Sequence, residues 1–362
     1  MILEAVNSLR TGPLPQETTV VPREGSADVS ATLAWPAPVA DQLSGRRAGQ
    51  LVAGRYRLGR LLGRGGMGAV WLATDEWLGR TVAVKQPVLA DAATDREHRA
   101  AARGRLRTEA RLAARVDHPG TVRVYDLAEE AGQPWIVMEA LSGRTLEAAL
   151  RDHGPRPIGE VIDLGLRLLE VLEATHRAGV VHRDLKPSNL QLCADARVVL
   201  TDFGIATTIP DGPGSREGRV TGSPAYMAPE LIQGDTVEPA SDLFSLGATL
   251  YTAVEGRSPF GKGCPVATLT AVLDAPPAPF RRAGPLRPVI EGLLAKDPGR
   301  RLDVDRARRA LQAIQGGGAP RPVERSGGRR RAALGTRGRR LGIRASRRTM
   351  LPLAGMHPTD AG

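Results

Sequence analysis

Aromatic residues, cysteines and long apolar runs are all scarce in this chain of 362 residues. Aromatic side chains make up 3% of it, so Leu, Val and Ala must supply most of the packing within a hydrophobic content of 41%, which is enough for a sizeable core. The two cysteines, Cys193 and Cys264, are too few for a disulfide framework and lie in no Cys/His cluster. This usage argues against a zinc site and fits a reducing cytoplasm.

The chain also lacks the apolar segments that membrane targeting requires. No run of about 18 apolar residues occurs, so we predict no transmembrane helix. Glu4 and Asn7 interrupt the apolar residues at the beginning of the chain, so we predict no signal peptide. The expected location is cytoplasmic.

Positive charge is present in excess, but it is concentrated at one end. The net charge is +11, and residues 316–362 carry +9 of it, with eleven arginines against Glu324 and Asp360. We therefore predict a disordered N-terminal arm over residues 1–51, a folded domain over 52–315 and an Arg-rich disordered tail over 316–362. The tail is interpreted as a solvated extension. The alternative is contact with an anionic membrane or a nucleic acid, which would make binding depend on salt.

The hydrophobic periodicity changes along the folded domain. Three strands are expected between Tyr56 and Val88, a helix over residues 95–115, and two more strands over residues 121–127 and 134–138. After Leu141 the pattern is mostly helical. Helices are expected over residues 158–178 and 240–256, near 285–295 and over 304–314. A strand-rich part followed by a helix-rich part implies two lobes, and a cleft between lobes is a favoured ligand site.

A glycine-rich turn is the first chemical signal. It reads Gly63, Arg64, Gly65, Gly66, Met67 and Gly68, with Val70 two residues later. Glycines let the backbone approach a phosphate closely, although the motif alone is weak because dinucleotide folds share it. A dinucleotide motif precedes a helix, whereas this one precedes another strand that ends in Val82-Ala83-Val84-Lys85. Lys85 is therefore placed to meet a nucleotide phosphate.

Three further motifs follow in a fixed order: Val181-His182-Arg183-Asp184-Leu185-Lys186-Pro187-Ser188-Asn189, then Thr201-Asp202-Phe203-Gly204, then Ala228-Pro229-Glu230. With these residues the chain, over about residues 56–315, resembles the bacterial Hanks-type serine/threonine protein kinases, particularly the actinobacterial ones. The resemblance implies an α+β bilobal fold with a small β-rich N-lobe and a larger helical C-lobe. It also implies that residues 52–315 are a catalytic domain, which transfers the γ-phosphate of ATP to Ser/Thr hydroxyls of proteins, itself included.

The resemblance also implies a role for each matching residue. Lys85, paired with Glu109 on the first helix, should meet the α/β-phosphates. Asp184 should accept the substrate hydroxyl proton, and Lys186 should neutralise the transferred phosphate. Asn189 and Asp202 should hold Mg²⁺ or Mn²⁺. The expected nucleotide pocket consists of Gly63, Arg64, Gly65, Gly66, Met67, Gly68, Val70, Ala83, Lys85, Met138, Glu139, Leu141 and Gln191.

Two positions depart from the family pattern. Gln191 stands beneath the expected adenine, where relatives usually have an apolar side chain, and an amide there without a hydrogen bond costs about 1–3 kcal/mol. Ser223 replaces the usual threonine after Gly222 but keeps a hydroxyl. Two structural roles are also implied: Asp242 should brace the catalytic loop, residues 182–189, and Arg301 should pair with Glu230.

Regulation and partners follow from the same resemblance. A phosphate on the activation segment, about residues 202–230, should neutralise Arg183 and order the segment. The candidate acceptors are Thr207, Thr208, Ser215 and Thr221, of which Thr221 and Ser215 are preferred. Glu17-Thr18-Thr19-Val20 resembles the sites that recruit forkhead-associated domains, although a plain polar linker is the favoured interpretation. Relatives often dimerise through the back of the N-lobe.

Three other readings remain open at this point. A pseudokinase scaffold would bind partners without catalysis, but such proteins usually lack at least one of Lys85, Glu109, Asp184, Asn189 and Asp202. A small-molecule phosphotransferase of the aminoglycoside-kinase type would share the catalytic loop, but the Lys186-Pro187 pair and Ala228-Pro229-Glu230 favour a protein substrate. A nucleic-acid binder is favoured by the tail alone, and no dedicated nucleic-acid site is predicted.

Overall fold

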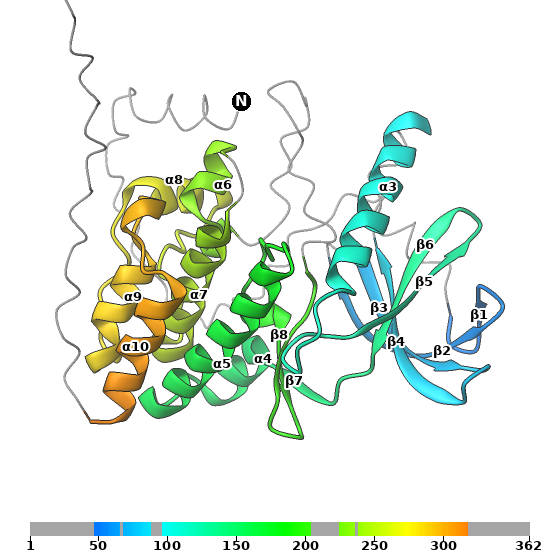
Figure 1. Ribbon diagram of the computed structural model, residues 1–362, viewed down its shortest axis with the longest axis horizontal. Helices are drawn as coiled ribbons and strands as arrows, with labels where there is room; N and C mark the ends of the chain where they lie inside the picture. Colours follow the sequence, from blue (N-terminus) through cyan, green and yellow to red (C-terminus); the bar gives the residue numbers. More distant parts are fainter. Residues whose placement is uncertain (1–46, 66–67, 88–95, 204–223, 236–237, 318–362) are drawn as a thin grey trace, which may run out of the picture. The chain divides into compact units, whose positions relative to one another are not determined.

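The computed structural model describes residues 47–65, 68–87, 96–203, 224–235 and 238–317, without the side chains of 96–102, 105 and 109. Within these residues a strand-rich part precedes a helix-rich part, as predicted (Figure 1). The predicted turn at Gly66 and Met67, most of the activation segment, the N-terminal arm and the Arg-rich tail lie outside the described residues.

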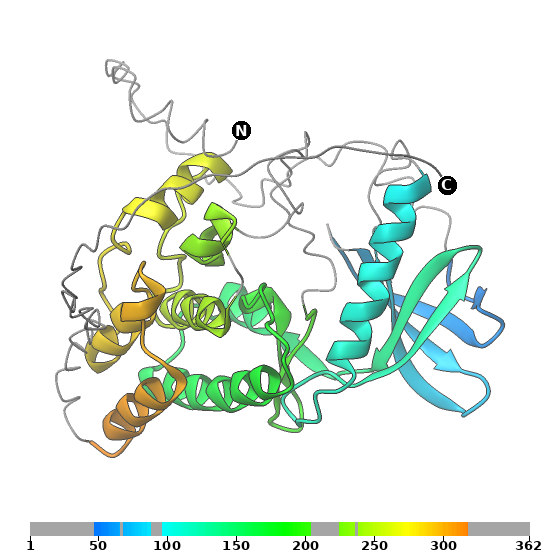
Figure 2. The same ribbon diagram turned by 45° about the horizontal axis from the view of Figure 1, so that its top comes forward.

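The strand-rich part is one antiparallel sheet of six strands in the order β1-β2-β3-β4-β6-β5. Its strands are β1 (Leu51–Val52), β2 (Tyr56–Gly65), β3 (Gly68–Asp75), β4 (Arg80–Pro87), β5 (Val124–Glu130) and β6 (Gln133–Glu139). Helix α3 (Arg96–Ala113) connects β4 to β5 and contacts β5, as the two views of the ribbon show (Figures 1 and 2).

Alternation of side chains divides the sheet into two apolar faces. Successive side chains on a strand point to opposite faces. In β4, Val82 and Val84 join a cluster with Tyr56 and Trp135, in which all four are at most 1% exposed. The intervening Ala83 joins a different cluster, which includes residues of α3 and of the helical part. Ala83 and, two residues later, Lys85 therefore lie on the second face of the sheet, which faces the helical part.

The helix-rich part consists mainly of seven helices within the described residues: α4 (Leu146–His153), α5 (Ile158–Arg177), α6 (Pro229–Gln233), α7 (Pro239–Glu255), α8 (Pro265–Asp274), α9 (Arg287–Leu293) and α10 (Val304–Gln315). Side chains cap three of them: Thr145 Oγ1 accepts from the Ala148 N–H at the start of α4, Cys264 Sγ accepts from the Ala267 N–H at α8, and Asp303 accepts from the Arg306 N–H at α10.

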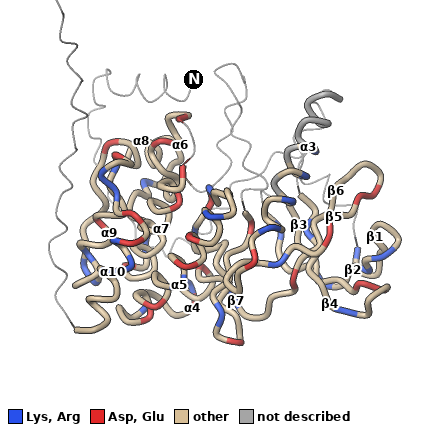
Figure 3. Tube along the Cα trace, viewed as in Figure 1, with Lys and Arg blue, Asp and Glu red and all other residues tan. Residues whose placement is uncertain are grey.

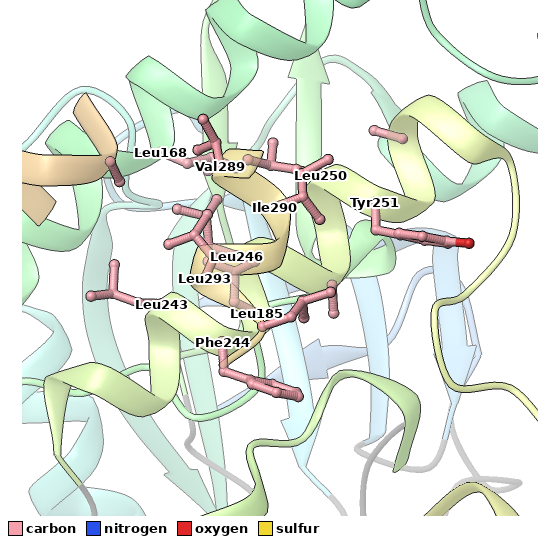
Figure 4. Close-up of a cluster of buried hydrophobic side chains, with 14 of the residues drawn as sticks. Leu168, Leu185, Leu243, Phe244, Leu246, Leu250, Tyr251, Val289, Ile290 and Leu293 are labelled. Atoms are coloured by element: carbon pink, nitrogen blue, oxygen red, sulfur yellow. The ribbon is translucent and has the colours of Figure 1, made fainter. Parts of the chain in front are cut away.

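A single large core holds these helices together. Figure 4 shows Leu168 of α5, Leu246 of α7 and Ile290 of α9 converging, and all three are completely buried. The helices approach closely because Gly247 has no side chain: a Cβ built there would lie 2.7 Å from the Cβ of Leu293. Leu185 of the catalytic loop is also fully buried in this core, which anchors the segment between Asp184 and Lys186.

One sequence prediction needs correction, and one small sheet was not anticipated. The strand expected over residues 121–127 begins at Val124, because Thr121 instead forms an isolated parallel bridge with Leu200. The sequence also gave no sign of a small antiparallel sheet of β7 (Gly143–Thr145), β8 (Leu190–Cys193) and β9 (Val198–Leu200). Strands of three or four residues are too short to show an alternating pattern.

Acidic and basic residues are interspersed along the described part of the chain (Figure 3). None of the helices described there is both long enough and apolar enough to cross a bilayer.

Candidate active site

Lys85 and Asp202 join the sheet to the catalytic region. Lys85 Nζ lies 2.6 Å from Asp202 Oδ1, and the lysine side chain is 4% exposed whereas that of Asp202 is 27% exposed. Burial acts to raise the pKa of Asp202, but the charge and hydrogen bond of Lys85 outweigh it and hold the pKa below its usual range. Asp202 is therefore an anion at neutral pH. Its backbone has φ +57°, a left-handed conformation that costs energy in a residue other than glycine.

The catalytic loop brings three of its own polar side chains together, those of Asp184, Lys186 and Asn189. Lys186 Nζ lies 3.0 Å from Asp184 Oδ1 and 2.8 Å from Oδ2. Asn189 Nδ2 donates to both the backbone oxygen of Asp184, at 2.8 Å, and its carboxylate Oδ2, at 2.9 Å. All three residues are at most 8% exposed. The carboxylate of Asp184 is thus held in a fixed orientation by two donors from its own loop.

Asp242 of α7 braces this loop, as the sequence predicted. Its carboxylate accepts hydrogen bonds from the backbone N–H groups of His182, at 2.9 Å, and Arg183, at 2.8 Å, and it contacts His176 Nε2 at 2.8 Å. Arg183 has φ +67°, so the loop turns sharply before Asp184. A buried anion that receives two backbone N–H groups compensates for this strain.

The side chains present fit a bound divalent cation. Both protons of the Asn189 amide nitrogen are used within the loop, which leaves its Oδ1 as an acceptor, and Asp202 Oδ2 makes no protein hydrogen bond within the described residues. Mg²⁺ prefers oxygen ligands and is commonly held by one or two protein groups together with substrate phosphates. The described residues contain no cluster of three or more His, Cys, Asp or Glu that would hold a metal by itself.

The apolar residues predicted to surround adenine lie in one cluster. Val70, Ala83, Met138 and Leu141 all pack in the cluster that also contains Phe203. Ala83 and Met138 are direct neighbours across β4 and β6. Gln191 lies on β8, opposite Thr145 and Val199, and its amide has no hydrogen-bond partner among the described residues. The sheet and the helical part therefore both contribute to this apolar site.

The described ends of the glycine-rich hairpin are shaped by Gly68. Gly63 pairs with Val70, Arg64 with Ala69 and Gly65 with Gly68 across β2 and β3. Gly68 has φ +133°, and a Cβ there would lie 2.0 Å from the Gln86 carbonyl oxygen, so only glycine fits. No atom of the described residues would lie within 4 Å of a Cβ at Gly63 or Gly65, so these residues leave open space beside both positions. Gly66 and Met67 lie outside the described residues.

Several predicted contacts remain outside the part of the chain that is described. Glu109 lies in α3, but its side chain is not described. Among the side chains that are described, Lys85 pairs with Asp202. The candidate phosphorylation sites at positions 207, 208, 215 and 221 belong to the segment 204–223, which is not described either.

Sequence reasoning missed two contributors to the site. His182 lies beside Phe203, with ring centroids 5.0 Å apart, and its Nε2 contacts the Thr201 backbone oxygen at 2.9 Å. Arg197, in the turn between β8 and β9, forms an ion pair with Glu139 at 2.7 Å. His182 was visible in its motif, but no local signal linked Arg197 to Glu139, which is 58 residues away.

Comparison with known proteins identifies a matching family. Residues 56–312 match the family model described as "Protein kinase domain". The chain is 37% identical over 262 residues to serine/threonine-protein kinase PknA of Mycobacterium tuberculosis, which covers 70% of this chain and 60% of that protein. It is 37% identical over 278 residues to the probable serine/threonine-protein kinase SCO3848 of Streptomyces coelicolor, which covers 74% of this chain and 41% of that protein. The chain thus spans about 60% or less of the length of these relatives.

Proposed function

Because this chain belongs to the protein kinase family, we propose that it transfers the γ-phosphate of ATP to serine and threonine hydroxyls of proteins, including its own. The family uses ATP with a divalent cation and acts on protein substrates. The observation that best supports the proposal is the convergence of Lys85 and Asp202 with the Asp184–Lys186–Asn189 cluster, because phosphoryl transfer needs positioned charges of both signs.

Each of these residues has a distinct proposed task. Asp184, held by Lys186 and Asn189, accepts the proton of the substrate hydroxyl as that oxygen attacks. Lys186 offsets the negative charge of the transferred group, and Lys85 orients the nucleotide phosphates. Asn189 and Asp202 would hold Mg²⁺ or Mn²⁺, which would supply positive charge to offset the negative charge of the nucleotide phosphates.

Intact mass spectrometry of the purified chain tests this proposal. After incubation with ATP and Mg²⁺ or Mn²⁺, mass steps of one phosphate should appear in the wild type and be absent from an Asp184→Asn variant. Peptide mapping would then show whether Thr221 and Ser215 accept phosphate. No phosphate on the chain or on an added generic protein substrate would contradict the proposal and favour a pseudokinase scaffold.

Gln191 gives a prediction about nucleotide affinity. Its amide lies at the proposed adenine site and has no partner among the described residues, so covering it with a base removes it from water without compensation. We expect Gln191→Leu to tighten ATP binding by about 1 kcal/mol, which is about fivefold in Kd. Isothermal titration calorimetry with ATP and Mg²⁺ measures this, with Gln312→Leu on the exposed face of α10 as the control. Unchanged or weaker binding by Gln191→Leu would mean that the amide hydrogen-bonds the ligand.

Exposed apolar side chains in the turn between β3 and β4, together with Tyr125 of β5, support a second proposal, that two copies of the chain associate there. Trp77 is 73% exposed, Leu78 60% and Tyr125 40%. The Arg55 guanidinium lies over the Trp77 ring, 4.9 Å from its centroid, and that of Arg80 lies over the Tyr125 ring at 4.1 Å, so each ring makes a cation–π contact. Exposed aromatic side chains flanked by arginines are typical of protein interfaces.

Sedimentation velocity of the full chain tests this association. The wild type should form a dimer as its concentration rises, and Leu78→Asp should stay monomeric because the charge would have to be buried. Val266→Asp, at an exposed apolar position on α8, is the matched control and should dimerise normally. A wild type that stays monomeric, or a Leu78→Asp variant that dimerises equally well, would refute the proposal.

A further inference from the structure

The hairpin of β8 and β9 has functionally different ends. At one end, Asn189 immediately precedes β8, and Asp202 follows two residues after β9. At the other end is the turn that contains Asp195 and Arg197. Since β8 has only four residues, the two ends are separated by about 13 Å. A contact made by the turn can therefore set the position of the two proposed cation ligands.

Arg197 makes one contact within this turn and two contacts to groups outside it. Its Nη2 donates to Glu139 Oε1 at 2.7 Å, and its Nε donates to Asp195 Oδ2 at 2.7 Å. Its Nη1 contacts the Pro119 backbone oxygen at 3.4 Å. The hydrogen bond that Arg197 donates to Glu139, and then the one it donates to Asp195, raise its pKa above the usual value. The guanidinium is thus a fixed positive charge in a planar contact with two carboxylates.

Glu139 belongs to the segment that connects the two parts of the fold. It is the last residue of β6, pairs with Val82 of β4 and donates its backbone N–H to the Arg123 oxygen at 2.9 Å. Its side chain is 17% exposed, and its Oε2 is buried without a hydrogen-bond partner among the described residues. Arg197 is therefore the cation that compensates a largely buried carboxylate at the end of the sheet.

The segment before β5 is already attached to β9 by the backbone. The Leu200 N–H donates to the Gly120 oxygen at 2.8 Å, and the Val122 N–H donates to the Leu200 oxygen at 3.1 Å. Gly120 is tightly enclosed, since a Cβ there would lie 2.4 Å from Val171 Cγ2. These bonds leave the strand that ends at Glu139 as the second connection to the helical part, and among the described residues Arg197 forms the side-chain link there.

We propose that Arg197 is a positioning residue that clamps the end of β6 to the β8–β9 hairpin and thereby slows nucleotide release. This inference rests on the proposed function, because it assumes that a nucleotide binds between Lys85 and Asp202. With the clamp intact, Asn189 and Asp202 stay at a fixed distance from the sheet that carries Lys85. Without it, the two parts separate more readily and the bound nucleotide escapes faster.

The expected effect is moderate because the ion pair is only partly buried. The Arg197 side chain is 34% exposed, and pairs of this kind contribute up to about 1 kcal/mol. We therefore expect Arg197→Gln to raise the dissociation rate of a fluorescent ADP analogue with Mg²⁺ by about fivefold, with little change in the association rate. The KM for ATP should rise while kcat is maintained.

Stopped-flow kinetics on the full chain test the clamp with a double-mutant cycle. Arg197→Gln, Glu139→Gln and the double variant should release the analogue at similar, raised rates, because all three lack the same contact. Arg197→Lys should restore part of the wild-type rate by keeping the charge. Arg167→Gln is the matched control, since Arg167 Nη1 donates to the Ala196 oxygen of the same turn at 3.0 Å but is not bonded to Glu139.

Hydrogen exchange of the nucleotide-free protein separates the clamp from the proposed function. Faster exchange over residues 136–142 is expected in Arg197→Gln and not in Arg167→Gln. A protein that binds no nucleotide but shows this difference would refute the proposed function and keep the clamp. Equal release and exchange rates in the wild type and Arg197→Gln would refute the clamp, as would equal changes in Arg197→Gln and Arg167→Gln.

Discussion

Replacing Asp184 with asparagine is expected to lower kcat for protein phosphorylation by about 10²–10⁴-fold, the usual contribution of a positioned acid–base group. Asparagine is nearly the same size and still accepts hydrogen bonds from Lys186 and Asn189, so the loop should keep its geometry. The variant loses the negative charge that accepts the hydroxyl proton. Steady-state phosphorylation of a generic protein substrate measures the loss.

The selectivity of the Asp184→Asn effect is checked by two further measurements. ATP affinity should stay close to the wild-type value, because Asp184 is proposed to contact the substrate hydroxyl and not the nucleotide. Asp163→Asn serves as the control, since Asp163 is an exposed residue of α5 that bonds Gln315. Undiminished phosphorylation by Asp184→Asn would mean that another group accepts the proton.

Replacing Arg301 with methionine is expected to lower the free energy of unfolding by about 3–5 kcal/mol, because it leaves a buried carboxylate without its partner. The predicted pair with Glu230 is present: Nη1 lies 2.6 Å from Oε1, and Nη2 lies 3.0 Å from Oε2. The two side chains are 1% and 7% exposed. Arg301 also donates to the backbone oxygens of residues 240, 295 and 296. Urea unfolding measures the change, which is large against a typical total of about 5–15 kcal/mol.

A partly exposed ion pair provides the matched comparison for Arg301. Arg308 bonds Glu173 across α10 and α5, with 25% and 37% of the side chains exposed, so Arg308→Met should cost under about 1 kcal/mol. Adding Glu230→Leu to Arg301→Met should recover part of the lost stability, since no unpaired charge then remains buried. If Arg301→Met and Arg308→Met lowered the free energy of unfolding equally, burial would not determine how much the Arg301–Glu230 pair contributes to stability.

Much of the fold could be predicted from the sequence because its elements have clear periods. The buried residues of α5 recur at three- and four-residue steps, and the predicted range 158–178 differs from the observed helix by one residue. The Asp184–Lys186–Asn189 cluster was also within reach, because its members lie within six residues and the loop itself brings them together. Local order in the chain determined these features.

Other features depended on contacts between distant segments. Thr121 has the alternating neighbours of a strand residue, yet its backbone bridges Leu200, because the segment before β5 packs against β9. The ion pair of Glu139 with Arg197 joins residues 58 apart and has no motif. Lys85 and Asp202, 117 residues apart, were matched only through the family resemblance, and the tertiary structure placed them 2.6 Å apart.

The sequence by itself therefore determined the elements, the catalytic loop and the type of chemistry, since these depend on neighbouring residues and on ordered motifs. Only the tertiary structure decided how the sheet meets the helical part, which carboxylate each arginine pairs with, and how the β8–β9 hairpin links the end of β6 to Asn189 and Asp202. The physical reason is that a charge selects its partner by distance and burial after folding, and neither quantity is visible in the order of the residues.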